Sequence, residues 1–187
     1  MQTLIGQHIE QSIRTKQAIL ASGEITQSII AAALLCKNAL ARGNKILIAG
    51  NGGSAADAQH MAAELIRRFE KNRPSMAAIA LTTDTSALTA IANDFGYEHV
   101  FARQVEGLGR AGDVFIGIST SGNSANIITA MAAADNQHMH TIGLMGDSGK
   151  LQHLSNVAIC VPCTRTATIQ ESHLMIEHIL CALIEAD

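Results

Sequence analysis

The chain has 187 residues, of which 48% are hydrophobic and 16% are charged, and its formal net charge is −3. This composition excludes a disordered chain and a fibrous rod, and it predicts one globular domain over residues 1–187 with a substantial buried core. There is no basic tract, and with four Phe, one Tyr and no Trp the chain has few rings for base stacking, so direct nucleic-acid binding is not expected.

The first residues, MQTLIGQHIEQSIRTKQ, are polar and lack the basic-then-apolar order of a secretory signal. No apolar run reaches the roughly 18 residues of a membrane span. We therefore expect a cytoplasmic protein with no membrane partner.

Apolar residues recur at helical spacing in residues 2–21 and 25–41, and Gly43 with Asn44 provides a stop. Short apolar runs then alternate with helical stretches. The predicted strands are residues 45–50, 76–81, 113–119, 139–145 and 157–162. The further predicted helices are residues 54–71, 84–92, 98–108, 124–136 and one from about 167 to the C-terminus.

Continuously apolar strands that are separated by helices are typical of a parallel sheet covered on both faces. We therefore expect a doubly wound α/β domain with a five-stranded parallel sheet, preceded by two helices within residues 1–42. In such sheets ligands bind beyond the carboxyl ends of the strands, so the loops at that edge are the first candidates for a site.

The four cysteines are too few for a disulfide scaffold. Cys36 and Cys181 fall in apolar helical patterns and are predicted to lie in the core. Cys160 and Cys163 form a Cys-Val-Pro-Cys pair, which could be redox-active at the start of a helix. Because the pair ends an apolar, strand-like run instead, we interpret it as structural.

The first strand is followed by Asn51-Gly52-Gly53-Ser54. The glycines allow the backbone to approach a ligand closely, and Ser54 can cap the next helix. An ordinary capped turn is the alternative interpretation, because Gly, Ser and Asn are common in such turns.

The third strand is followed by Ser119-Thr120-Ser121-Gly122-Asn123-Ser124. Hydroxyl groups, a glycine and a helix N-terminus in one place suit a phosphate monoester, although a capped turn remains the alternative here as well. Neither loop contains a Gly-Lys-Ser/Thr motif or the GxGxxG spacing. A sugar phosphate therefore fits better than a nucleotide.

His60 and Glu64 lie four residues apart on a predicted helix and so share one face. Gln170 and His178 are eight residues apart on the last helix, about 12 Å along its axis. Two imidazoles, a carboxylate and an amide oxygen would make a plausible metal site.

Spacing alone leaves this metal site undecided, because eight histidines produce chance pairs such as His173 with Glu177. Glu171 and Glu177 are equally compatible with solvated positions.

Four segments carry a family resemblance: AGNGGSAADAQHMAAEL, LTAIANDFGYEHVF, GDVFIGISTSGNSANI and TATIQESHLMIEHIL. They resemble the phosphoheptose isomerases of the sugar isomerase (SIS) domain superfamily, and the resemblance covers nearly the whole chain. That family converts sedoheptulose 7-phosphate to D-glycero-D-manno-heptose 7-phosphate through an enediol, the entry to ADP-heptose and the lipopolysaccharide core. The resemblance implies the same activity here, in a homotetramer whose N-terminal helices, within residues 1–42, pack between subunits.

The resemblance also implies which residues form the site. One Zn²⁺ per subunit is expected on His60, Glu64, Gln170 and His178. Phosphate binding is expected at Ser119, Thr120, Ser121 and Ser124. Sugar contacts are expected from Asn51, Gly52, Gly53, Glu64, Asn93, Asp94 and Gln170. Glu64 is the predicted base, and His178 is the predicted acid.

One position departs from the family pattern. Some members carry an aspartate three residues before the metal-binding glutamine, whereas this chain has Ala167. An expected polar contact in the pocket is therefore missing.

The competing interpretation is a relative in the same superfamily, the initiator-associating protein of bacterial replication, which is a tetrameric scaffold that binds DnaA. That relative lacks the acid and the histidine that correspond to Glu64 and His178. Because both residues are present here, the enzyme is the favoured interpretation and the scaffold is the alternative. A sugar-phosphate sensor is disfavoured, because no helix-turn-helix extension occurs.

Overall fold

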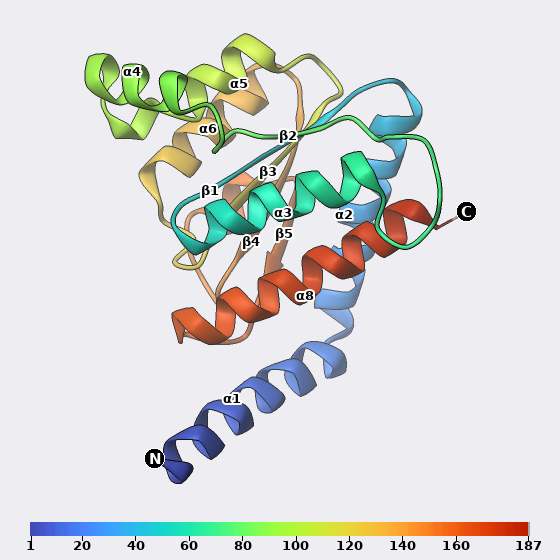
Figure 1. Ribbon diagram of the computed structural model, residues 1–187, viewed down its shortest axis with the longest axis vertical. Coiled ribbons are helices and arrows are strands. Elements are labelled where there is room, and N and C mark those ends of the chain that lie inside the picture. The colour runs from blue at the N-terminus through green and yellow to red at the C-terminus, as the bar shows by residue number, and fades with distance from the viewer. Residues whose placement is uncertain (187) are drawn as a thin grey trace.

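A five-stranded parallel sheet forms the centre of the computed structural model, which describes residues 1–186 (Figure 1). The strands are β1 (Ile46–Gly50), β2 (Ala78–Ala80), β3 (Val114–Ser119), β4 (His140–Met145) and β5 (Val157–Cys160). Their order is β2-β1-β3-β4-β5, so the direction in which strands are added reverses after β2 and makes β1 and β3 neighbours. This order confirms the predicted doubly wound α/β fold and puts its switch point between β1 and β3.

Helices cover both faces of the sheet (Figure 1). They are α1 (Gln2–Ala21), α2 (Gly23–Ala41), α3 (Gly53–Arg67), α4 (Thr85–Phe95), η1 (Tyr97–His99), α5 (Ala102–Leu108), α6 (Ala125–Asn136), α7 (Leu151–Leu154) and α8 (Thr166–Glu185). The two helices before β1 agree with the prediction. The short helix α7 was not predicted, because four residues are too few to display a helical period.

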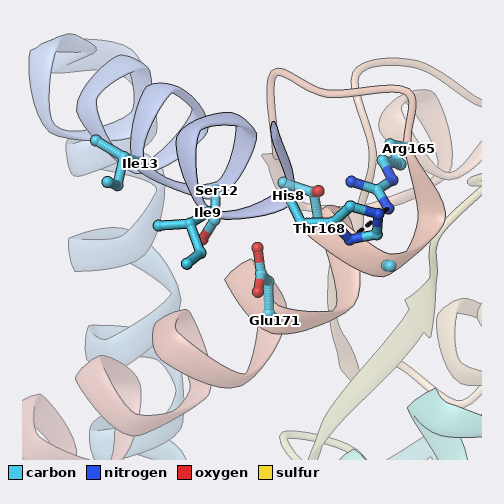
Figure 2. Close-up of a pocket in the computed structure, with 8 residues that line it drawn as sticks. His8, Ile9, Ser12, Ile13, Arg165, Thr168 and Glu171 are labelled. Carbon is cyan, nitrogen blue, oxygen red and sulfur yellow. Dashed lines mark hydrogen bonds between the residues drawn. The ribbon is translucent and has the colours of Figure 1, made fainter. Parts of the chain in front are cut away.

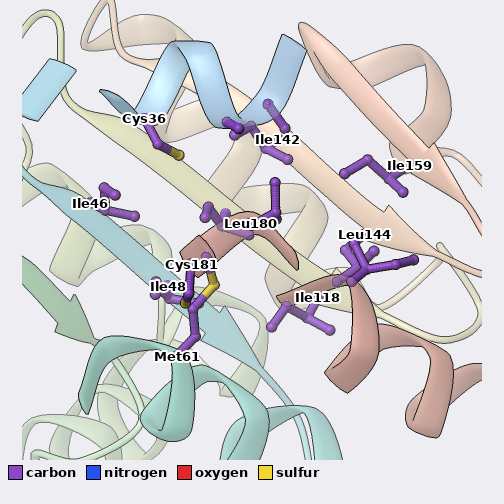
Figure 3. Packing of buried hydrophobic residues seen from close by; sticks show 14 of the residues in the cluster. Cys36, Ile46, Ile48, Met61, Ile118, Ile142, Leu144, Ile159, Leu180 and Cys181 are labelled. Atoms are coloured by element: carbon purple, nitrogen blue, oxygen red, sulfur yellow. The ribbon is translucent and has the colours of Figure 1, made fainter. Parts of the chain in front are cut away.

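Side chains alternate along the strands, and this alternation divides the core in two. Ile46 and Ile48 of β1 pack in the cluster formed with α2, α3 and α8, which Figure 3 shows from close by. Leu47 and Ala49 point to the other cluster, which includes residues of α5 and α6. Both faces of the sheet are therefore buried.

Cys36 and Cys181 lie in the cluster of Figure 3, as predicted. Burial raises the pKa of each thiol to about 12, so both stay protonated at neutral pH. Cys160 ends β5, and Cys163 is buried with its sulfur accepting a hydrogen bond from the N–H of Arg165 at 3.4 Å. All of these cysteines are free thiols, and the structural role of Cys160 and Cys163 stays a prediction.

The predicted helix over residues 54–71 was wrong in its last turn, since α3 ends at Arg67. The cause is a carboxylate from the other end of the chain. Glu185, at the last turn of α8, accepts hydrogen bonds from the N–H groups of Phe69 at 3.0 Å, Glu70 at 2.8 Å and Lys71 at 3.2 Å. Because those N–H groups donate to Glu185 of α8, they are not available to donate to the carbonyl groups four residues earlier, and the helix does not continue.

Two further boundaries differ from the prediction. The stretch predicted as one helix over residues 98–108 consists of the 3₁₀ turn η1 and then α5. The helix predicted over residues 84–92 continues to Phe95, where Gly96 ends it with a φ of +93°. That φ is accessible to glycine at little cost, which makes Gly96 a natural helix stop.

α1 extends away from the sheet, and only Thr15 and Ile19 of this helix are buried (Figure 1). Leu4, Ile5 and Ile9 are among its exposed apolar residues. Within residues 1–186, no single helix combines the length and apolarity needed to cross a membrane. α1 and α2 reach that length and composition only as a pair, and the pair is bent by 77°.

Replacement of Glu185 by Gln is expected to lower the free energy of unfolding at pH 7 by about 2 kcal/mol, because hydrogen bonds to a buried charge are lost. Burial raises the pKa of Glu185, but the N–H groups of residues 69–71 and the Arg73 guanidinium outweigh it and hold the pKa at about 2. This stabilisation is therefore complete above the ordinary value of 4.5 and is lost as the pH falls toward about 2. Urea unfolding of the unaltered protein and the variant measures this effect. The difference between their free energies of unfolding should become smaller as the pH falls.

The matched control is Glu171→Gln on the same helix, where the side chain is 46% exposed. Its unfolding free energy should change by less than about 0.5 kcal/mol. Equal stability of Glu185→Gln and the unaltered protein at pH 7 would contradict the role given to Glu185.

Candidate active site

The loops after β1 and β3 meet at the carboxyl edge of the sheet. The side-chain amides of Asn51 and Asn126 form a reciprocal pair, with N···O distances of 2.9 and 2.8 Å. Tyr97 donates from its hydroxyl to Asn51 Oδ1 at 3.1 Å, which adds the segment after α4 to this junction. Asn51 was predicted as a site residue, whereas Asn126 and Tyr97 were missed, because only the fold brings them next to Asn51.

The loop after β3 gathers hydroxyl groups at the start of α6. Ser119 Oγ lies 2.8 Å from Ser124 Oγ and 3.4 Å from Ser121 Oγ. Ser124 is the N-cap residue of α6, yet its side chain makes no capping hydrogen bond. The hydroxyls therefore converge where the helix offers free N–H groups and a partial positive charge, which suits an anion. Thr120 adjoins them and is half-buried.

Gly52 and Gly53 lie at the start of α3, and the backbone at Gly52 favours glycine. Gly52 has a φ of +56°, in the left-handed region. A Cβ on Gly53 would lie 2.7 Å from Gln170 Nε2, so the Gln170 side chain packs directly against the first turn of α3. This contact places Gln170 of α8 beside the loop after β1.

His60 of α3 and His178 of α8 face each other. Their Nε2 atoms are 2.9 Å apart, and His60 Nε2 is 3.9 Å from Glu64 Oε1. The ring of Phe69 packs on His178 with a centroid distance of 5.5 Å. The fold thus joins two helices that are more than a hundred residues apart in the sequence.

The imidazole pair is compatible with a shared metal ion. Two nitrogens on one tetrahedral zinc, each at 2.0–2.1 Å, stand about 3.3 Å apart, close to the spacing seen here. Within residues 1–186, no three His, Cys, Asp or Glu side chains are close enough to hold a metal ion as they stand. A complete ligand set would need Glu64 and Gln170 to turn toward the imidazoles.

Asn93 and Asp94 lie at the exposed end of α4. The Asn93 amide donates to Asp94 Oδ1 at 2.7 Å. Asn93 and Asp94 precede Tyr97 by four and three residues, and Tyr97 contacts Asn51. The segment that follows Asn93 and Asp94 therefore contacts the loop after β1 through Tyr97, but the side chains of Asn93 and Asp94 do not.

Glu177 was compatible with a solvated position from the sequence, and this interpretation was wrong. Glu177 and His173 are fully buried, and within the described part of the chain neither carboxylate oxygen and neither imidazole nitrogen has a hydrogen-bond partner. Burial, with the charge of Asp57, raises the pKa of Glu177 to about 8. Burial lowers the pKa of His173 to about 4. His173 lies four residues after Ile169 and three before Ile176, and Glu177 lies three before Leu180; this spacing was the signal that they share the apolar stripe of α8.

Ala167 opens to a pocket of about 230 Å³ between α1 and the first turn of α8 (Figure 2). Arg165 contacts His8 across this pocket at 2.7 Å, and Thr168 and Glu171 also line it. The position at which some relatives carry an aspartate thus lies on the α1 side of α8, whereas Gln170 lies against Gly53.

Comparison with known proteins identifies the family. The SIS domain model matches residues 7–146. A phosphoheptose isomerase from Aneurinibacillus thermoaerophilus is 52% identical over 186 residues, which cover 99% of this chain and 94% of that protein.

Solved structures agree with this match. A phosphoheptose isomerase from Neisseria gonorrhoeae superposes with a TM-score of 0.92 at 49% identity and 98% coverage of both chains. Another, from Francisella tularensis, gives a TM-score of 0.93 at 38% identity, covering 98% of this chain and 97% of that one. The chain therefore belongs to the SIS domain family and, within it, to the phosphoheptose isomerases, which makes it a sugar-phosphate isomerase.

Proposed function

We propose that the chain acts in the cytoplasm and converts sedoheptulose 7-phosphate to D-glycero-D-manno-heptose 7-phosphate, the first step toward ADP-heptose and the lipopolysaccharide core. The observation that carries this proposal is that the fold brings His60, Glu64 and His178 together, while the loop after β3 gathers hydroxyl groups at the start of α6. An aldose–ketose isomerase needs these two parts: groups that move a proton at one end of the sugar and an anchor at the other.

The proposed anchor holds the phosphate at Ser119, Thr120, Ser121 and Ser124. Their hydroxyls and the free N–H groups of α6 donate to the phosphate oxygens. Asn51, Gly52, Gly53, Asn93, Asp94 and Gln170 contact the sugar hydroxyls along the rim between the two loops. A long, flexible substrate is thereby fixed at a point remote from the reacting carbons, which leaves C1 and C2 in a defined position.

At the reacting end, Glu64 removes a proton from C1 of the ketose and returns it to C2, which passes through an enediol. His178 donates a proton to the carbonyl oxygen at C2 and later accepts one from the hydroxyl at C1. His60, Glu64, Gln170 and His178 would hold one Zn²⁺ per subunit. When bound there, the ion supplies a Lewis acid that polarises the carbonyl oxygen.

We also propose a homotetramer in which α1 and α2 pack between subunits. Ile5, Ile9 and Ile13 recur every four residues on α1 and are about half exposed. An apolar groove of about 500 Å³ follows between α1, α2 and α8, with Leu20, Ile30, Ile179 and Leu183 in its lining. Apolar surfaces of this extent favour burial against another copy of the chain.

The DnaA-binding scaffold gains no support from these observations. The relatives reported above are isomerases by name, and both residues that the scaffold lacks, Glu64 and His178, are present at the site.

Glu64→Gln should reduce kcat for sedoheptulose 7-phosphate by about 10²–10⁴-fold, because the amide cannot accept the proton from C1. Substrate binding should persist, since the phosphate anchor is untouched. NMR measures turnover, and calorimetry measures substrate affinity. Glu106→Gln, on the exposed face of α5, is the control and should retain full activity. Turnover retained by Glu64→Gln would remove Glu64 as the base.

Chelation should abolish turnover, and Zn²⁺ should restore it, because the Lewis acid is removed and replaced. Metal analysis should find one zinc per chain in the active protein and less in His60→Ala, since an imidazole ligand is lost. Full turnover in protein freed of metal would contradict the zinc site.

Sedimentation should give about four times the chain mass of 19.7 kDa. Ile9→Asp should shift the protein to smaller species, because a carboxylate in an apolar interface loses its hydration. Glu10→Gln, on the neighbouring exposed position, should leave the assembly intact. A monomer at micromolar concentration would contradict the proposed assembly.

A further inference from the structure

The loop between α3 and β2 is tied to the last turn of α8 by a nearly buried ion pair. Arg73 and Glu185 have side chains that are 10% and 2% exposed, and Arg73 Nε donates to Glu185 Oε1 at 2.9 Å. The same carboxylate accepts the N–H groups of residues 69–71. The pair thus links the segment that leaves α3 to the helix that carries His178.

The rest of the Arg73 guanidinium binds the end of α3. Nη1 donates to the carbonyl oxygen of Leu65 at 2.8 Å, and Nη2 donates to the carbonyl oxygen of Glu64 at 3.1 Å. The last carbonyls of a helix have no partner within the helix, and helix ends fray when nothing else binds them. Arg73 therefore holds the backbone of the residue proposed as the base.

A second contact extends this effect to the proposed acid. The Phe69 N–H is bound by Glu185, and the Phe69 ring packs against the His178 ring. The loop that Glu185 fixes is therefore also the loop that limits the rotation of the His178 imidazole. The Arg73–Glu185 pair therefore restrains the backbone of Glu64 and, through the Phe69 loop, the imidazole of His178.

We propose that Arg73 is a positioning residue for the isomerisation, with Glu185 as the group that orients its guanidinium. The inference rests on the proposed function, because it assumes that Glu64 and His178 react with the sugar. Arg73 acts only through the backbone of Glu64, and Glu185 acts through Arg73 and through the Phe69 loop.

The test compares Arg73→Lys with the unaltered protein. Lysine keeps the positive charge for Glu185, but its single ammonium group cannot reproduce the planar fork that reaches Glu185 and two carbonyls together. We expect kcat for sedoheptulose 7-phosphate to fall about 10-fold or more, because a small displacement of the base is costly. KM should stay within about threefold, since the phosphate is bound at the end of another strand.

The matched control is another buried carboxylate that clamps a loop far from the site. Asp113, just before β3, is 1% exposed and accepts hydrogen bonds from the N–H groups of Lys45 and Arg110. Asp113→Asn and Glu185→Gln should lower the Tm to a similar extent, but only Glu185→Gln should lower kcat. Equal losses of kcat in these two variants, or full kcat in Arg73→Lys, would overturn the positioning role.

Turnover by the unaltered protein tests the proposed function separately. If it turns over no sedoheptulose 7-phosphate, the proposed function fails, and the zinc affinities of the same proteins test the positioning role. A zinc Kd about 10-fold weaker in Arg73→Lys, with Asp113→Asn unchanged, supports that role, because Glu64 is displaced as a ligand. Equal zinc Kd values for the unaltered protein, Arg73→Lys and Asp113→Asn would overturn the positioning role.

Discussion

The contact between α3 and α8 on one face of the sheet fixes the distance between His60 and His178. Neither helix could do this alone, because each contributes one imidazole to a pair whose nitrogens are 2.9 Å apart. The contact has an apolar part, in which Met61 and Cys181 belong to the same core cluster. It also has a charged end, where Glu185 binds the loop that follows α3. Apolar packing and the charged end therefore both hold the two helices together.

α8 also buries groups that proteins normally keep in contact with water. His173 and Glu177 are fully buried on its apolar stripe, and burial favours the neutral form of each at neutral pH. Neutral groups cost far less to bury than charged ones, although unpartnered polar atoms still carry a penalty. The α8 interface is therefore less stable than one in which apolar side chains occupy these two positions.

The strand order of the sheet brings together the two loops of the candidate site. β1 and β3 are neighbours only because the chain returns across β1 after β2. The loops after these two strands consequently meet, and the Asn51–Asn126 amide pair joins them. The proposed anion-binding groups and the proposed proton-transfer groups therefore lie on separate elements.

The sequence by itself determined the class of fold and the loops that are candidates for the site. Apolar runs separated by helical stretches indicated the five strands, and the Gly- and Ser-rich loops marked the carboxyl edge, because these signals depend on local spacing. Tertiary structure decided what depends on distant residues: the end of α3 at Arg67, set by Glu185, the burial of Glu177, and the meeting of His60 with His178. A local pattern cannot encode these features, since each depends on a partner more than a hundred residues away or on the packing of several elements.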